Sequence, residues 1–260
     1  MLPVQRRARV IEILRKEEIV SLRDLASAVP TSLSSLRRDI DYLEDAGFLE
    51  KTRGGVILKH DQMARVEPEP DLAAAIESDA KAEIGKRAAQ LIQSGQNVIF
   101  DSGSTTLATA RIAASRGLPF HAITNDIRIA AVLSTNSRIT VEVSGGRLRP
   151  GSSTLLGPDA LRTFMRLRAD LAFIGAHAVD DTCFSDSSVE LADLKGEIIR
   201  AAKFKVLVAD YTKFGQRSLC SIGEVGSLNR IVTDRRLDSV LTDHYRSLGI
   251  EIDIADEPVQ

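Results

Sequence analysis

A short segment near the N-terminus, residues 32–43, combines hydroxyl and guanidinium side chains with regularly spaced aliphatic residues. The aliphatic residues recur with helical spacing and predict one buried helix face made of Leu33, Leu36, Ile40 and Leu43. At about 100° per residue, Ser34 and Arg38 project from the opposite side and Arg37 from the flank. Arginine bridges guanine O6 and N7 or binds phosphate, and serine lets a backbone come close. This chemistry suits the DNA major groove, although an isolated Arg-Arg pair is also typical of a solvated helix face.

Two further helices are predicted before this segment. A helical stripe indicates a first helix over residues 4–16, with four arginines expected on its outer face, namely Arg6, Arg7, Arg9 and Arg15. Ser21 is a suitable N-cap for a second helix over residues 22–29. Pro30 ends that helix, because its ring clashes with a continuing turn and it has no N–H to donate.

The third helix leads into a predicted hairpin. Thr31 or Ser32 caps the helix and Gly47 stops it. Residues 48–58 then predict two short strands around a turn that contains Gly54 and Gly55. Three helices and a hairpin form an α+β winged helix-turn-helix, whose third helix enters the groove and whose wing lies over phosphates. The expected DNA-binding residues are Ser32, Ser34, Ser35, Arg37, Arg38, Lys51 and Arg53.

The N-terminal motifs resemble one known family. The runs Leu36-Arg37-Arg38-Asp39-Ile40 and Arg53-Gly54-Gly55, with Gly47 between them, resemble the DeoR family of bacterial sugar-metabolism regulators. Pro30-Thr31 stands where that family usually has a Gly-Val turn, and Ser35 stands where it usually has Thr. The resemblance implies that operator DNA is a partner, and the two differences bear on the docking angle.

Composition alone does not select a function. The chain has 260 residues, 43% hydrophobic content and a net charge of −2, which suits one large or two modest globular domains. Residues 1–60 carry eleven basic and nine acidic side chains, and the remainder carries 23 basic and 27 acidic ones. Because this asymmetry is weak, the placement of individual arginines carries the DNA argument.

Several classes of protein are not expected. The two cysteines, Cys183 and Cys220, have no CxxC spacing, which fits reduced thiols in a cytoplasmic protein. No apolar run approaches membrane-spanning length, so no membrane partner is expected. We also expect no cofactor and no metal site, because the histidines are scattered at His60, His121, His177 and His244.

A boundary is predicted near the first quarter of the chain. Residues 67–70 read Glu-Pro-Glu-Pro, and alternating prolines favour an extended, poorly helical connection. We therefore predict a DNA-binding domain over residues 1–58, a linker over 59–78 and a second domain over 79–260.

The second domain begins with a pattern typical of phosphate binding. Helical and strand patterns alternate from residue 80 onward, which predicts an α/β sheet with helices on its faces. The loop Asp101–Thr106 lies between a predicted strand over residues 97–100 and a predicted helix over 107–114. Unpaired amides and hydroxyls at a helix N-terminus suit a phosphate, while an ordinary capped turn has the same composition.

Polar residues also follow later predicted strands. Thr124-Asn125 ends one apolar strand, residues 144–149 end another in a glycine pair and two arginines, and Gly175-Ala176 ends a third. A fourth strand runs into the segment 209–215, which is polar and contains Lys213. Ligands of open α/β sheets bind beyond the carboxyl ends of the strands, where these residues gather.

The series of motifs in this half resembles the DeoR-type sensor domain, whose fold is shared with ribose-5-phosphate isomerases and CoA transferases. The resemblance implies a phosphorylated sugar effector and homo-oligomers. Its phosphate cradle corresponds to Ser102, Gly103, Ser104, Thr105 and Thr106. The other effector-binding residues that it implies are Asp101, Asn125, Gly145, Gly146, Arg147, His177, Lys195 and Lys213. Single members of this set also fit plainer structural roles: a cap for Asp101, an ion pair with Asp210 for Lys213 and a packed or solvated ring for His177, which departs from the family pattern.

The leading hypothesis is a DNA-binding transcriptional regulator, most simply a repressor of a carbohydrate-catabolism operon, acting as a dimer or tetramer. The alternative is an isomerase or CoA-transferase-like enzyme with a DNA-binding appendage. Glu190 and Asp193 near Lys195 could serve acid–base chemistry, although helical spacing explains them equally well as surface charges. A module that binds a nucleotide or an unphosphorylated sugar is a third hypothesis.

Overall fold

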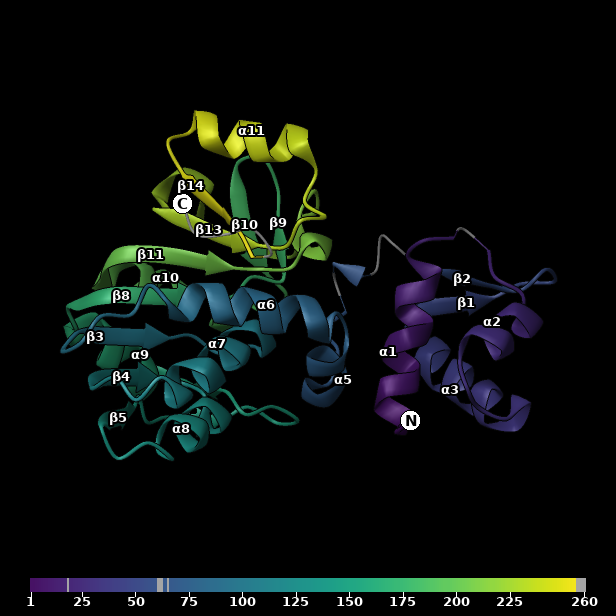
Figure 1. Ribbon diagram of the computed structural model, residues 1–260, viewed down its shortest axis with the longest axis horizontal. Coiled ribbons are helices and arrows are strands. Elements are labelled where there is room, and N and C mark those ends of the chain that lie inside the picture. The colour runs from purple at the N-terminus through teal and green to yellow at the C-terminus, as the bar shows by residue number, and fades with distance from the viewer. Residues whose placement is uncertain (18, 60–62, 65, 256–260) are drawn as a thin grey trace. The chain divides into compact units, whose positions relative to one another are not determined.

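The computed structural model describes residues 1–17, 19–59, 63–64 and 66–255. The chain divides into two compact units, Met1–Ser78 and Asp79–Gln260. Figure 1 shows both units. Each unit has its own hydrophobic core.

The first unit is a small helical domain with a hairpin. Its elements in chain order are α1 (Pro3–Leu14), α2 (Leu22–Ala28), α3 (Leu33–Asp45), β1 (Leu49–Lys51), β2 (Val56–Leu58) and α5 (Pro70–Ala75). The two strands are antiparallel, and Lys51 pairs with Val56 at the end next to the turn. A Cβ atom at Gly55 would collide with the carbonyl of Val20, so the wing requires glycine there. The winged helix-turn-helix predicted from the sequence is confirmed.

Local capping explains where the helices of this unit begin. The Ser21 hydroxyl accepts a hydrogen bond from the Asp24 amide at 3.1 Å, and Ser32 accepts one from the Ser35 amide at 3.2 Å. Each bond satisfies an amide that has no partner inside its helix. Pro30 follows α2 and prevents its continuation, as predicted.

Tertiary contacts overturn two expectations about the helix faces. Leu33 was expected on the buried face of α3, but its side chain is 54% exposed, because it is the first residue of the helix and extends beyond the core. Arg6 and Arg7 were expected on the outside, yet both bind the carboxylate of Asp39, which is only 2% exposed. The Arg7 guanidinium also stacks on the Tyr42 ring, 3.6 Å from its centroid.

The segment expected to be an extended linker is partly helical. Helix α5 lies within residues 59–78, and Pro70 occupies its first turn, where a missing N–H costs nothing. Leu72 and Ile76 are buried in the core of the first unit. The linker prediction is therefore wrong for this part, because proline starts this helix instead of preventing it.

The second unit is built around parallel strands (Figure 1). Its elements in chain order are α6 (Ser78–Ala89), β3 (Asn97–Phe100), α7 (Ser104–Ser115), β4 (Phe120–Thr124), α8 (Ile127–Leu133), β5 (Ile139–Val143), β6 (Arg147–Leu148), β7 (Leu155–Leu156), α9 (Pro158–Arg166), β8 (Ala169–Ile174), β9 (Ala178–Val179), β10 (Cys183–Asp186), α10 (Val189–Ala201), β11 (Ala202–Val208), η1 (Tyr211–Lys213), β12 (Cys220–Glu224), η2 (Val225–Ser227), β13 (Arg230–Thr233), α11 (Ser239–Ser247) and β14 (Glu251–Ile254). Among the described residues, seven strands form one sheet in the order β14-β13-β11-β8-β3-β4-β5, with every neighbouring pair parallel. This is the α/β architecture predicted for the second domain.

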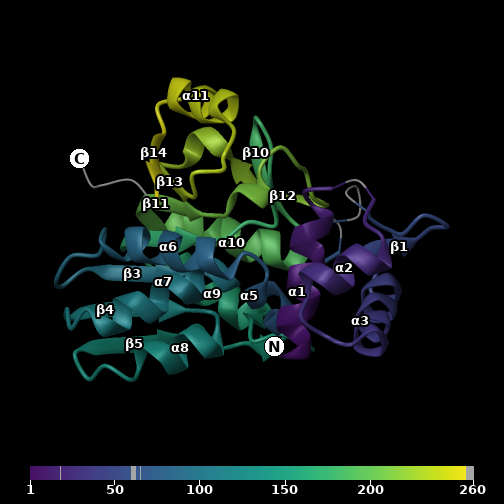
Figure 2. The same ribbon diagram turned by 45° about the vertical axis from the view of Figure 1, so that its right-hand side comes forward.

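Helices cover both faces of the parallel sheet. Helices α6, α7 and α8 pack on one face, and α9 and α10 pack on the other, as Figure 2 shows. The side chains of β3 alternate accordingly: Val98 and Phe100 belong to the core under α6, α7 and α8, and Ile99 belongs to the core under α9 and α10. Because both faces are covered, the ends of the strands remain as the places where polar groups gather.

The carboxyl ends of the strands form one polar edge. Asp101 follows β3, Asn125 follows β4 and Gly175 follows β8. Strands β3 and β4 end level with each other, because Phe100 pairs with Thr124. A separate antiparallel sheet, in the order β12-β10-β9, supplies Asp186 from the end of β10.

Candidate functional site

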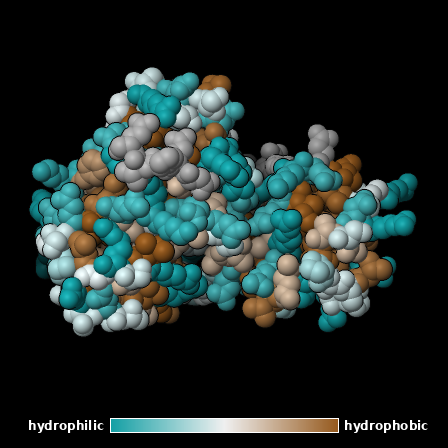
Figure 3. Space-filling model, in the orientation of Figure 1, coloured by the Kyte–Doolittle hydropathy of each residue, from teal (hydrophilic) through white to brown (hydrophobic). Residues whose placement is uncertain are grey.

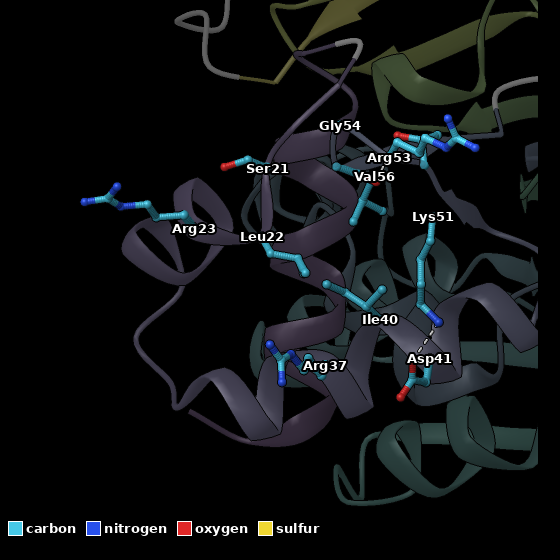
Figure 4. A pocket seen from close by; sticks show the side chains of 12 residues that line it. Ser21, Leu22, Arg23, Arg37, Ile40, Asp41, Lys51, Arg53, Gly54 and Val56 are labelled. Atoms are coloured by element: carbon cyan, nitrogen blue, oxygen red, sulfur yellow. Dashed lines mark hydrogen bonds and ion pairs between the residues drawn. The ribbon is translucent and has the colours of Figure 1, made fainter.

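The first unit has a pocket bounded by α2, α3 and the wing (Figure 4). Its volume is about 560 Å3. The residues that line it are Ser21, Leu22, Arg23, Arg37, Ile40, Asp41, Lys51, Thr52, Arg53, Gly54, Gly55 and Val56. The concave surface thus has an apolar floor and a largely polar rim, with cationic side chains from three elements.

Three arginines at this pocket carry uncompensated charge. Arg23, Arg37 and Arg53 have no ion pair or side-chain hydrogen bond among the residues that the structure describes. Figure 4 shows the Arg23 and Arg53 side chains extending outward. Unpaired guanidinium groups on an exposed surface are available to bind phosphates or base edges. Arg38 is exposed as well, and its Nε donates a hydrogen bond to the Ser34 carbonyl at 3.3 Å.

Lys51 differs from these arginines, because its charge is already paired. Its Nζ lies 2.6 Å from an Asp41 carboxylate oxygen, as Figure 4 shows, and 2.5 Å from a carboxylate oxygen of Glu44, and both acidic residues are on α3. Its backbone amide also donates to Glu44 at 3.0 Å. Hydrogen bonds to Asp41 and Glu44 raise the pKa of Lys51 above its ordinary value. Lys51 was expected over phosphates; in the structure it ties the wing to α3.

The predicted serines lie together at the N-terminus of α3. The Ser32 hydroxyl is 3.0 Å from the hydroxyls of both Ser34 and Ser35. Ser32 and Ser34 are exposed, and Ser35 is half-buried. A helix N-terminus with small hydroxyl side chains allows close approach to a phosphate group.

The second unit contains a buried ionic cluster at the polar edge of its sheet. The ammonium group of Lys195 on α10 lies 2.6 Å from Asp101 Oδ2, 2.8 Å from the Gly175 carbonyl and 3.3 Å from Asp186 Oδ2. Asp101 Oδ2 also accepts a hydrogen bond from the Gly175 amide at 3.0 Å. Two of the three N–H donors of the ammonium group are thus used in hydrogen bonds, and Asp186 is held as an ion pair. Lys195 therefore holds Asp101 in place.

Burial and charge act in opposite directions on this cluster. Burial raises the pKa of Asp101, and the positive charge of Lys195 opposes that shift. Burial on its own lowers the pKa of Lys195, but the carboxylates of Asp101 and Asp186 outweigh it and raise that pKa above its ordinary value. Lys195 is thus a permanent cation between two acidic side chains.

Two polar side chains, one in this cluster and one at the end of the neighbouring strand β4, have unused hydrogen-bonding atoms. Asp101 Oδ1 and both amide atoms of Asn125 are buried and have no hydrogen-bond partner among the described residues. Both side chains are 0% exposed. Buried polar groups in native proteins are normally satisfied, so these atoms call for a partner outside the protein chain, a water molecule or a ligand.

The loop between β3 and α7 adjoins Asp101. Ser102, Thr105 and Thr106 are buried, and the Thr106 hydroxyl donates to the Gly103 carbonyl at 2.8 Å. Gly103 has φ = +144°, a conformation that favours glycine, and it is exposed. With Ser104 as its first residue, α7 presents its unpaired amides at this loop. Asp101 is not the cap of α7, since Gly103 occupies that position.

The remaining predicted effector residues lie at other strand ends. Arg147 is 78% exposed and lies 3.9 Å from Glu190. Gly145 and Gly146 form the exposed turn before β6, and the His177 amide donates to the Ser185 carbonyl at 3.0 Å, just before β9. Lys213 is half-buried in η1. The described contacts do not join Arg147 to the Asp101 cluster.

Sequence reasoning missed two residues that the structure brings to these sites. Arg23 lines the pocket of the first unit from α2. Asp186 completes the contacts of Lys195, whereas Glu190 and Asp193, considered above for acid–base chemistry, are exposed. No motif spacing pointed to either residue.

Two other features, a membrane-spanning helix and a metal site, are absent from the described residues. None of their helices is long and apolar enough to cross a membrane. They also contain no group of three or more His, Cys, Asp or Glu side chains arranged to hold a metal ion. On the face that Figure 3 shows, hydrophilic residues cover much of the surface, with hydrophobic residues between them.

Family comparisons match both units. A DeoR-like helix-turn-helix domain matches residues 6–62, and the DeoR C terminal sensor domain matches residues 76–235. The chain belongs to the DeoR family. The HTH-type transcriptional regulator GlpR of Haloferax volcanii is 29% identical over 257 residues, covering 97% of this chain and 98% of the relative. The HTH-type transcriptional repressor GlcR of Bacillus subtilis is 26% identical over 255 residues, covering 97% of this chain and 96% of its own.

Among solved structures, ribose 5-phosphate isomerase A of Methanocaldococcus jannaschii is similar with a TM-score of 0.40 and 19% identity, covering 53% of this chain and 55% of that one. The relatives of this DeoR-family protein are named as transcriptional regulators and not as enzymes. The protein is a DNA-binding transcriptional regulator with a sensor domain for a small molecule.

Proposed function

We propose that this DeoR-family protein represses a carbohydrate-catabolism operon and that a phosphorylated sugar controls its affinity for operator DNA. The observation that carries the DNA half of the proposal is the set of three unpaired arginines around one pocket beside α3. One relative, GlcR of Bacillus subtilis, is named as a repressor, which supports the direction of regulation.

The DNA contact is assigned to α3 and its two flanks. The N-terminal turn of α3 enters the major groove, where Arg37 and Arg38 reach base edges or phosphates and the hydroxyls of Ser32, Ser34 and Ser35 contact the backbone. Arg53 on the wing and Arg23 on α2 bind phosphates on either side of the pocket. Lys51 fixes the distance between wing and helix through Asp41 and Glu44.

The effector contact is assigned to the polar edge of the sensor sheet. The amides and hydroxyls of Ser102–Thr106 bind the phosphate, because they lie at the N-terminus of α7. Asp101 and Asn125 bind the sugar portion with their unused atoms, and Lys195 keeps Asp101 in position. We propose that residues at neighbouring strand ends line the route by which the effector reaches this edge. They are Gly145, Gly146, Arg147, His177 and Lys213.

Control of DNA affinity follows from linkage between the two sites. We propose that the protein is a homo-oligomer, a dimer or tetramer, that places two α3 helices about one DNA turn apart. An effector that prefers a different arrangement of the oligomer lowers the population competent to bind the operator. A coupling free energy of about 2–3 kcal/mol weakens operator binding by tens to about a hundredfold.

The test is operator binding by an Arg37→Ala variant of the full chain. The DNA is a duplex that the wild-type protein enriches from a randomised library, and binding is followed by fluorescence anisotropy across salt concentrations. A base contact predicts a loss of about 1–3 kcal/mol and relaxed sequence preference, and a phosphate contact predicts a salt slope smaller by about one. Arg162→Ala, which removes an exposed arginine from α9, is the matched control. Equal affinity and salt slope in both variants would refute the assignment of α3.

A further inference from the structure

The unused atoms at the sensor edge define the chemistry of what they bind. Asp101 Oδ1 and Asn125 Oδ1 are hydrogen-bond acceptors, and Asn125 Nδ2 supplies two donors. The ligand portion beside them must therefore offer hydrogen-bond donors as well as an acceptor. Hydroxyl groups do both, whereas an ionised carboxylate accepts only.

The charge of the same cluster points in the same direction. Lys195 is the cation that contacts the two carboxylates Asp101 and Asp186: its ammonium group donates to Asp101 and to the Gly175 carbonyl and lies 3.3 Å from Asp186. Asp101 and Asp186 together outweigh its single positive charge. A ligand carboxylate placed here would thus meet a local excess of negative charge beside an ammonium group that already has three protein oxygens around it.

Asp101 and Asn125 are also close enough to act on one ligand segment. Their strands are adjacent and end in register, since Phe100 pairs with Thr124. Neighbouring strands lie about 5 Å apart. Two hydroxyl groups on successive carbon atoms, each with its hydrogen bond, span a comparable distance. The phosphate loop begins at the next residue of the chain, Ser102.

We propose that the effector is charged at its phosphate end only: its other end is neutral and hydroxylated, as in the phosphate ester of a sugar or sugar alcohol. The sensor rejects the corresponding phosphorylated sugar acid. This selectivity rests on the proposed function, because it takes the phosphate to lie on Ser102–Thr106. Asp101 and Asn125 are its specificity determinants, and Lys195 and Asp186 are positioning residues.

The experiment is isothermal titration of the full-length protein with matched pairs of ligands. Erythritol 4-phosphate is compared with erythronate 4-phosphate, ribitol 5-phosphate with ribonate 5-phosphate, and glucitol 6-phosphate with gluconate 6-phosphate. In at least one pair, we expect the sugar-alcohol phosphate to bind at least about tenfold more tightly than the matching sugar-acid phosphate. An acid that binds as tightly as its partner, or more tightly, overturns the selectivity and leaves the proposed phosphosugar control standing. If no member of either series binds, and neither do ribose 5-phosphate and glucose 6-phosphate, both the phosphosugar proposal and the selectivity are refuted.

A charge-removing variant tests whether these residues set the selectivity. Asp101→Asn removes one negative charge, so the preference for the hydroxylated ligand is expected to shrink at least threefold. Asp186→Asn removes a negative charge and leaves Asp101 Oδ1 unchanged. It is the substitute variant if Asp101→Asn does not fold. Lys86→Met, at an exposed pair on α6, is the control and is expected to keep the wild-type preference. An unchanged preference in a folded Asp101→Asn or Asp186→Asn protein would contradict the proposal.

Discussion

Two buried carboxylates with cationic partners, Asp39 in the first unit and Asp101 in the second, differ in how their oxygens are used. Asp39 in the first unit has one oxygen 2.7 Å from Arg6 and the other 3.1 Å from Arg7. Asp101 in the second unit directs Oδ2 to Lys195 and Gly175, while its Oδ1 has no partner among the described residues. Both oxygens of Asp39 are therefore used inside the first unit, whereas Asp101 keeps a buried oxygen that can accept a hydrogen bond from a water molecule or a ligand.

The cations of the two units differ in the opposite sense: those on the surface of the first unit are unpaired, and the one in the cluster of the second unit is paired. In the first unit, Arg37 and Arg53 are exposed and unpaired among the described residues, which suits a polyanion that arrives from solvent. In the second unit, Lys195 is buried and hydrogen-bonded to Asp101 and the Gly175 carbonyl. Exposed, unpaired cations thus suit the binding of a polyanion, whereas a bonded cation beside unused hydrogen-bonding atoms suits recognition through hydrogen bonds.

The largest expected effect comes from removing the buried cation. Lys195→Met leaves Asp101 and Asp186 without their positive partner, which is expected to cost about 3–5 kcal/mol of sensor stability. The folded-state pKa of Lys195 is raised, so its contribution is fully present below its unfolded pKa of about 10.4 and is lost only above it. Urea unfolding between pH 5 and 8, assigned by hydrogen exchange of β3 peptides, should show a cost that grows as pH rises, because burial raises the pKa of Asp101 and the variant lacks the cation that opposes this shift.

Arg7→Met is the companion variant in the first unit. Asp39 keeps Arg6, so the loss there is expected to be smaller, about 1–2 kcal/mol. A Lys195→Met protein as stable as the wild type would show that the two buried carboxylates do not need this cation.

A smaller effect of opposite sign is expected at Asn125. Asn125→Leu replaces two unsatisfied amide atoms with an apolar group of similar size, which should stabilise the ligand-free sensor by about 1 kcal/mol. The same change should abolish binding of the hydroxylated phosphate esters. Asn136→Leu is the control, because Asn136 donates to the Ala114 carbonyl and accepts from the Arg138 amide and should lose stability. Destabilisation by Asn125→Leu would mean that Asn125 is already satisfied in the free protein.

Helix periodicity predicted the elements of the first unit well and their contacts less well. Caps at Ser21 and Ser32 and the stop at Pro30 depend on local chemistry, so the sequence displays them directly. The pairing of Arg6 with Asp39 joins residues 33 positions apart, and no local rule specifies it. Leu33 was misplaced because a helical stripe gives the direction of a side chain but not where the core ends.

The candidate ligand site was partly visible in the sequence for a similar reason. Polar residues after apolar strands predicted that Asp101 and Asn125 lie at one edge of the sheet, since parallel strands share that edge. Asp186 comes from a different, antiparallel sheet, and its approach to Lys195 depends on how the two sheets pack. Which oxygen of Asp101 remains unused depends on side-chain geometry, which composition and spacing do not contain.

The most direct test of the account is release of operator DNA by a phosphorylated polyol. The full-length protein is bound to its enriched duplex, and anisotropy is recorded during titration with erythritol, ribitol and glucitol phosphates, with their unphosphorylated parents as controls. We predict that at least one phosphate ester weakens DNA binding by tens of fold or more and that its parent does not. The same ester should have no such effect on Gly103→Val, whose backbone at φ = +144° disfavours a β-branched residue in the phosphate loop. Equal responses to ester and parent, or a full response in Gly103→Val, would contradict control of operator binding through this loop.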